Sequence, residues 1–171
     1  MKLISEYAGQ RIFFKQPSVW KRYYELKVND EVMGSLQQKG FFGMKWEITI
    51  DKTTWELYKK SFWRSSMEIR ESGYEMPFAE VIRDGFRGKW LITLPKGERL
   101  KIVTHLFRSF SELRNEMEEC LVRIKPKASF KDKAEVTIEK KSEIVDKYPW
   151  SVVLAYMIIM QLKHQAAHAA H

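Results

Sequence analysis

Short segments in the first hundred residues alternate between apolar and polar side chains. In residues 24–28 (YELKV) every second side chain is apolar, and Asn29 and Asp30 follow as a hairpin-type turn. Residues 45–50 (KWEITI) repeat this alternation, which places Trp46 and Ile48 on one face. Similar segments, separated by turn signals, recur at roughly ten-residue spacing up to residue 106. This series predicts an all-β sandwich or barrel.

The chain also contains an internal repeat. Residues 40–50 match residues 85–94 when Met44 is treated as an insertion, and both copies contain Gly-Phe-x-Gly followed by Lys-Trp. The upstream segments correspond as well, so the copies cover 23–50 and 66–94, each predicted as a three-strand meander. The shared Gly-Phe-x-Gly could be a ligand-contacting loop. We favour a wide turn whose glycines adopt positive φ, with the tryptophans filling the core below it.

After residue 106 the pattern changes. Residues 110–119 predict a short helix, because Leu113 and Met117 lie four positions apart. Residues 120–124 and 134–139 predict two further strands.

Residues 150–162 (WSVVLAYMIIMQL) form a segment that is apolar on every face of a helix, with Pro149 at its first turn. Such a helix must be surrounded by protein or lipid. At about 1.5 Å per residue it spans roughly 20 Å, short of a hydrocarbon core of about 30 Å. About ten strands precede it, enough to enclose one helix. We therefore expect a mostly β fold: a closed antiparallel barrel around a buried helix at about 149–163, with residues 1–164 as a single domain and 165–171 as a disordered or frayed tail.

The strand meanders, the doubled Gly-Phe-x-Gly element and the apolar helix from Pro149 to Leu162 together resemble the tubby-like superfamily. This superfamily groups the tubby C-terminal domain, the LURP-one-related proteins and the phospholipid scramblases. The resemblance covers about residues 9–164 and implies a twelve-stranded barrel around a hydrophobic C-terminal helix. Residues 139–146 (EKKSEIVD) lack the alternating aspartates of the scramblase calcium segment, so calcium-activated scrambling is not expected. The phosphoinositide-binding basic residues of tubby align with no particular positions here.

Composition agrees with one globular domain, because the chain has 171 residues of which 44% are hydrophobic. The single cysteine, Cys120, cannot form an internal disulfide, and the N-terminus has no apolar stretch of secretory length. A cytoplasmic location is therefore expected.

Catalytic motifs are absent from the sequence: there is no Gly-x-Ser-x-Gly, Walker loop, His-Glu-x-x-His or Cys-x-x-Cys. His105 and Cys120 lie among apolar residues and are interpreted as structural. His164, His168 and His171 would share one face of a continued helix, but no carboxylate or cysteine nearby completes a tetrahedral shell. We expect no enzyme activity, no cofactor and no metal site.

The basic excess is the remaining functional signal, since Lys and Arg outnumber Asp and Glu by 30 to 22. Three cations, Arg83, Arg87 and Lys89, cluster on one predicted hairpin, and Lys125 and Lys127 lie on another predicted turn. These side chains could be ordinary solvated lysines and arginines. If the excess is functional, Arg83, Arg87 and Lys89 form one exposed patch with Lys125 or Lys127, which predicts a binding module for an anionic phospholipid or a phosphorylated ligand at a basic barrel rim.

Two alternatives remain open: an intracellular scaffold that binds another protein, and a tail-anchored membrane protein. Nucleic-acid binding would require exposed aromatic side chains among the charges. Most aromatics are instead expected on the core face of their strands.

Overall fold

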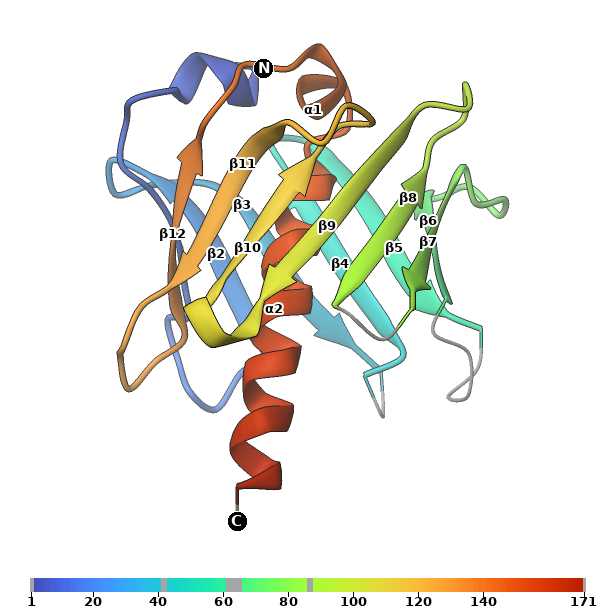
Figure 1. The fold of residues 1–171 in the computed structure, drawn as a ribbon. Coiled ribbons are helices and arrows are strands. Elements are labelled where there is room, and N and C mark those ends of the chain that lie inside the picture. The colour runs from blue at the N-terminus through green and yellow to red at the C-terminus, as the bar shows by residue number, and fades with distance from the viewer. Residues whose placement is uncertain (1, 41–42, 61–65, 86–87, 171) are drawn as a thin grey trace.

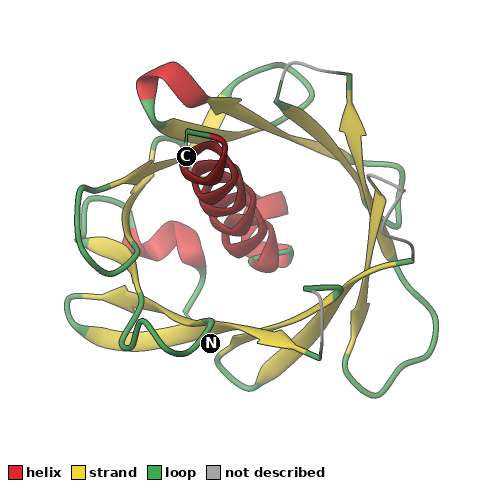
Figure 2. Ribbon diagram, turned by 90° about the horizontal axis from the view of Figure 1, so that it is seen from below, coloured by secondary structure: helices red, strands yellow, loops and turns green. Residues whose placement is uncertain are grey.

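A computed structural model describes residues 2–40, 43–60, 66–85 and 88–170. Twelve antiparallel strands form one closed barrel, in which each strand pairs with its chain neighbours and β1 closes against β12 (Figures 1 and 2). The strands are β1 (Ile12–Lys15), β2 (Tyr23–Val28), β3 (Glu31–Lys39), β4 (Lys45–Ile50), β5 (Thr53–Lys59), β6 (Ser66–Glu71), β7 (Ala79–Asp84), β8 (Lys89–Thr93), β9 (Arg99–His105), β10 (Phe110–Arg114), β11 (Cys120–Pro126) and β12 (Lys133–Ile138). The helices are η1 (Ile4–Tyr7), η2 (Leu106–Arg108), α1 (Glu143–Lys147) and α2 (Trp150–Ala169). The predicted fold class is confirmed.

Strict alternation of side chains builds the barrel wall. In β4 the side chains of Trp46, Ile48 and Ile50 are buried, whereas their neighbours are half-buried on the outer face. Successive side chains of a strand point to opposite faces, so the two-residue period of the sequence becomes an apolar lining and a polar exterior.

The two halves of the internal repeat have the same pairing register. Between the first and second strands of each copy, Glu25 pairs with Ser35 and Glu68 pairs with Glu80. Between the second and third strands, Leu36 pairs with Ile48 and Val81 pairs with Ile92. The correspondence extends to a fourth strand outside the sequence repeat, where Trp46 pairs with Leu57 and Trp90 pairs with Ile102. The repeated glycines Gly40, Gly43, Gly85 and Gly88 have φ values between +64° and +71°. This agrees with the turn interpretation. Phe41, Phe42, Phe86 and Arg87 lie outside the described residues.

Helix α2 passes through the barrel, as Figure 2 shows from below, and packs closest against β10 and β11. Its residues from Trp150 to Met160 are all buried, and the exposed fraction of Leu154 is 0%. Tyr156 stacks on Phe14 of β1 with ring centroids 4.0 Å apart. The helix then leaves the barrel and continues as an exposed, alanine-rich segment to Ala169. The sequence predicted a disordered or frayed tail at 165–171. Residues 165–169 are instead helical, which agrees with the high intrinsic helix propensity of alanine.

The prediction of a short helix at 110–119 is wrong, because this segment forms β10 and a turn. Leu113 is fully buried in the wall, whereas Met117 is exposed in the turn. The side chain of Asn115 accepts hydrogen bonds from the backbone N–H groups of Met117 and Glu119, at 3.1 and 3.0 Å, which fixes the turn. The short α-helix is instead α1.

Antiparallel strands send successive connections to opposite ends of the barrel (Figure 1). The end where α2 emerges, here called the helix-exit end, consists, among the described residues, of 16–22, 40, 43–44, 60, 85, 88, 106–109, 127–132 and 161–170. The other, here called the capped end, consists of residues 2–11, 29–30, 51–52, 72–78, 94–98, 115–119 and 139–149 and is covered by η1 and α1. Within the part of the chain that the structure describes, no helix is long and apolar enough to cross a membrane.

Candidate anion-binding rim

The helix-exit end carries a ring of positive charge. Six of the twelve strands have a lysine as their last residue at this end, against one aspartate, Asp84. These lysines are Lys15, Lys39, Lys45, Lys59, Lys89 and Lys133. The described residues of its connections include seven Lys or Arg side chains and a single acidic side chain, Asp132. They are Lys21, Arg22, Lys60, Arg108, Lys127, Lys131 and Lys163.

The capped end has the opposite balance. Its connections, all described, hold seven Lys or Arg side chains and eleven Asp or Glu side chains. The acids are Glu6, Asp30, Asp51, Glu75, Glu98, Glu116, Glu118, Glu119, Glu139, Glu143 and Asp146. The excess positive charge of the protein is therefore concentrated at one end of the barrel. As a result, the charge distribution produces an electrostatic field along the barrel axis.

Arg83 and Lys89 lie on the β7–β8 hairpin, as the sequence predicted, and both are exposed. Arg83 pairs directly with Trp90, so both side chains project from the inner face of the wall at the barrel mouth. Its guanidinium lies 5.5 Å from the centroid of that ring, a cation–π contact. Arg87, the third cation predicted here, lies outside the described residues.

Lys125 and Lys127 lie at the end of β11, on the same rim but on a different connection. Strands β9 and β10 separate them from β8, so at about 4.8 Å between neighbouring strands the two groups are roughly 14 Å apart. Lys125 is exposed, whereas the Nζ of Lys127 is 2.7 Å from Glu135 Oε2. The rim thus carries the predicted cations in two groups and not at one point.

Two neighbouring connections of this rim are tied together by hydrogen bonds. Lys131 Nζ donates to the carbonyl oxygen of Pro17 at 2.8 Å, and the Asp132 N–H donates to Gln16 Oε1 at 3.3 Å. The Asp132 carboxylate also lies 2.9 Å from His164 Nε2 on α2. Sequence reasoning missed these contacts because the partners are far apart in the chain, so no local spacing signals them.

The tyrosines in the barrel mouth have raised pKa values. Burial, together with the nearby Asp132 carboxylate, raises the pKa of Tyr24 to about 12. Burial raises the pKa of Tyr156 even further. Both hydroxyls therefore stay neutral at physiological pH, so the mouth gains no negative charge from them.

A buried carboxylate, Glu112, is a second feature that the sequence did not signal. It lies on the outer face of β10 and accepts hydrogen bonds from Arg114 Nε at 2.9 Å and Arg123 Nη2 at 3.2 Å, with His105 Nε2 at 3.3 Å. Burial opposes its ionisation, but the hydrogen bonds and the charge of Arg114 prevail and hold the pKa of Glu112 below its usual value. With both arginines satisfying the carboxylate, the cluster serves as a structural ion-pair network.

The thiol of Cys120 is a poor nucleophile. Burial raises its pKa to about 11, because the thiolate would lose its hydration. At neutral pH the side chain is therefore a protonated thiol.

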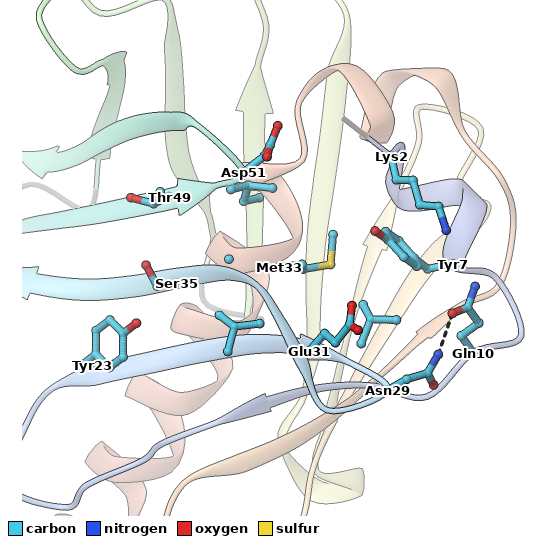
Figure 3. A pocket seen from close by; sticks show the side chains of 14 residues that line it. Lys2, Tyr7, Gln10, Tyr23, Asn29, Glu31, Met33, Ser35, Thr49 and Asp51 are labelled. Atoms are coloured by element: carbon cyan, nitrogen blue, oxygen red, sulfur yellow. Dashed lines mark hydrogen bonds between the residues drawn. The ribbon is translucent and has the colours of Figure 1, made fainter.

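A groove of about 740 Å³ lies at the capped end, beside β2, β3 and β4 (Figure 3). Asn29 Nδ2 donates to Gln10 Oε1 at 2.8 Å along one side of it. Its lining combines one cation, Lys2, with the acids Glu31 and Asp51. A polyanion would therefore find little electrostatic attraction in this groove.

Comparisons with protein-family models, with curated proteins and with solved structures found no match to this chain.

Proposed function

We propose that this protein is a non-enzymatic binding module whose helix-exit rim associates with the surface of an anionic phospholipid membrane. The observation that carries the proposal is the segregation of charge, with basic connections and strand ends at the helix-exit end and a net acidic set of connections at the capped end.

An extended anionic surface suits this rim better than a small phosphorylated ligand does. Arg83 projects from the inner face of the mouth, whereas Lys125 lies at the end of β11, which β9 and β10 separate from β8. Cations distributed around a circumference cannot converge on one phosphate, but all of them can approach a plane of headgroups. Each basic residue near an anionic membrane contributes about 1 kcal/mol, and the attraction decays over a Debye length of about 8 Å at physiological salt. The acidic capped end then faces away from the lipid.

We further propose that the chain is a member of the tubby-like superfamily. A closed twelve-stranded barrel around a C-terminal helix is the architecture expected of that superfamily, and it supports the proposal.

Sedimentation with vesicles tests the membrane proposal. Phosphatidylcholine vesicles with and without phosphatidylserine are compared at low and high salt, for the wild type and for the double variant Lys89→Glu, Lys125→Glu. Both lysines are exposed, and neither forms an ion pair with another described residue. The matched control is Lys52→Glu, Lys96→Glu, two exposed lysines of the capped end.

We expect binding that requires phosphatidylserine and weakens with salt. The rim variant should bind about tenfold more weakly or worse, because two contacts of about 1 kcal/mol each become repulsive. The control should bind like the wild type. Equal losses in both variants, or no binding of the wild type at low salt, would remove the proposal; capture of an acidic protein partner by the rim would then favour the scaffold alternative.

A further inference from the structure

Three aromatic side chains of the helix-exit end are almost completely exposed. The exposed fractions are 93% for Trp20, 106% for Phe107 and 91% for Phe130. They are the most exposed large apolar side chains among the described residues, and they lie on three different connections, between β1 and β2, β9 and β10, and β11 and β12. Single exposed apolar residues are ordinary, but three aromatic rings at one end of a barrel indicate an interaction surface.

Each ring is followed directly by a cation. The pairs are Trp20 with Lys21, Phe107 with Arg108, and Phe130 with Lys131. The sequence contains the same aromatic–basic pairing at positions 63–64 and 86–87, which lie outside the described residues and add nothing to the structural argument. An apolar ring beside a cation is the chemistry of a membrane interface, where rings lie at headgroup level and cations contact phosphates.

Hydrogen bonds restrain the connections that carry two of these rings. The β1–β2 and β11–β12 connections, which carry Trp20 and Phe130, are joined by the hydrogen bonds of Lys131 to Pro17 and of Asp132 to Gln16. Phe107 lies in the single turn of η2 between two paired strands. Because the flanking backbone is held, the rings would be buried on docking without a large loss of loop entropy.

We infer that Trp20, Phe107 and Phe130 insert into the interfacial layer of the anionic membrane, while Lys21, Arg108 and Lys131 contact the phosphates. This inference rests on the proposed membrane binding and adds an orientation, with the helix-exit end facing the lipid. The end of α2, residues 163–170, projects beyond the connections at this end and contains no carboxylate side chain, so it adds no negative charge toward the lipid (Figure 1). A bilayer plane can receive rings from three separate connections at once, whereas stacked nucleic-acid bases require neighbouring ring faces along one track.

The test separates insertion from charge attraction by salt dependence. The triple variant Trp20→Ala, Phe107→Ala, Phe130→Ala is compared with a matched control, Tyr74→Ala, Met76→Ala, Met117→Ala, whose residues are exposed at the capped end. Circular dichroism and thermal denaturation confirm that both variants fold. Vesicles containing phosphatidylserine are the probe, at low and at high salt.

We expect the aromatic variant to lose about tenfold in affinity or more, by a similar factor at both salt concentrations, because ring burial is not screened by ions. The rim-charge variant should instead lose most at low salt. Wild-type affinity in the aromatic variant, while the rim-charge variant is weakened, would overturn insertion and leave the membrane proposal standing. Failure of the wild type to bind would remove both.

A second measurement reports insertion directly. Lipids brominated near the headgroup quench tryptophan fluorescence on contact. Four of the other five tryptophans, Trp46, Trp55, Trp90 and Trp150, are buried in the barrel, and the fifth, Trp63, lies outside the described residues and is present in both proteins compared. Bound wild type should be quenched more than bound Trp20→Phe, although both bind alike. Equal quenching of the two proteins would contradict insertion. So would loss of single-stranded oligonucleotide binding in the aromatic variant with vesicle binding unchanged, which would assign the rings to nucleic acid.

Discussion

The capped end and the helix-exit end of this barrel are built from the same strands and differ in what their connections do. At the capped end, η1 is joined to α1 because the Ser5 backbone N–H and hydroxyl both donate to the Asp146 carboxylate, at 2.7 and 2.5 Å. Its β2–β3 and β4–β5 turns consist of two residues each. At the helix-exit end the described connections carry a large excess of cations over acids, together with exposed aromatic rings. We propose that the capped end mainly stabilises the fold and that the helix-exit end makes the contacts, and the following predictions test that division.

The largest expected effect concerns the part of α2 inside the barrel compared with the part outside it. Leu154→Asp should abolish soluble folding, because an unpaired buried carboxylate costs several kcal/mol or more, comparable with a domain stability of roughly 5–15 kcal/mol. His168→Asp, on the exposed end of the same helix, should fold normally. Soluble yield and circular dichroism measure both; a folded Leu154→Asp protein would contradict the barrel core.

Next is the buried ion-pair network around Glu112. Its folded-state pKa is lowered, so its ionised form stabilises the fold above the unfolded pKa of about 4.3, and this stability is lost as the pH falls through the folded pKa. Glu112→Gln should therefore lower the free energy of unfolding by about 2 kcal/mol at pH 7. Urea unfolding at several pH values should show the difference between wild type and variant shrinking below about pH 4. A difference independent of pH would exclude this assignment.

A smaller difference in stability is expected between two alanine substitutions, one at a glycine of each end. Gly88 has φ of +67°, and a Cβ atom there would lie 2.3 Å from Thr104 Oγ1, whereas a Cβ at Gly97, with φ of +80°, would meet nothing within 4 Å. Gly88→Ala should thus cost about 2 kcal/mol and Gly97→Ala about 1 kcal/mol, the latter from backbone strain alone. Thermal denaturation compares them, and equal losses would show that the contact with Thr104 relaxes freely.

The smallest effect is the most informative for function. Lys89→Glu and Lys125→Glu should each change stability by no more than about 0.5 kcal/mol, because exposed charges contribute little to folding. Thermal denaturation at low salt provides the measurement. A loss of about 2 kcal/mol would mean that the basic rim serves the fold, and its weaker vesicle binding would then need another explanation.

The local pattern of apolar and polar residues was sufficient to predict most of the barrel. Two-residue alternation, as in β4, and the wholly apolar α2 leave few ways to bury that much apolar surface, so a helix inside a closed wall follows from the sequence. The pattern failed at 110–119, where Leu113 and Met117 have helical spacing. Asn115 ends the strand with a side-chain-stabilised turn, and pairing with β9 and β11 overrides the weak local preference.

The candidate site shows the same limit more sharply. The sequence identifies Arg83, Lys89, Lys125 and Lys127 as cationic and near turns, but not the distance between them. It also expected most aromatics on the core face of their strands. Five strand aromatics, such as Trp46 and Trp90, are buried, but others, such as Phe13 and Tyr58, are only half-buried, and Trp20, Phe107 and Phe130 are exposed on connections. Whether a loop aromatic folds back or projects depends on neighbours distant in the chain, which local periodicity does not record.

The sequence by itself determined the composition of the wall, the buried helix and the net positive charge. Only the tertiary structure decided where that charge lies. Because neighbouring strands are antiparallel, successive connections alternate between the two ends, and charges dispersed along the chain are sorted into a basic rim and an acidic rim when the barrel closes. That sorting depends on the number and direction of all the strands together. No single sequence motif therefore predicts the surface that we propose for membrane binding.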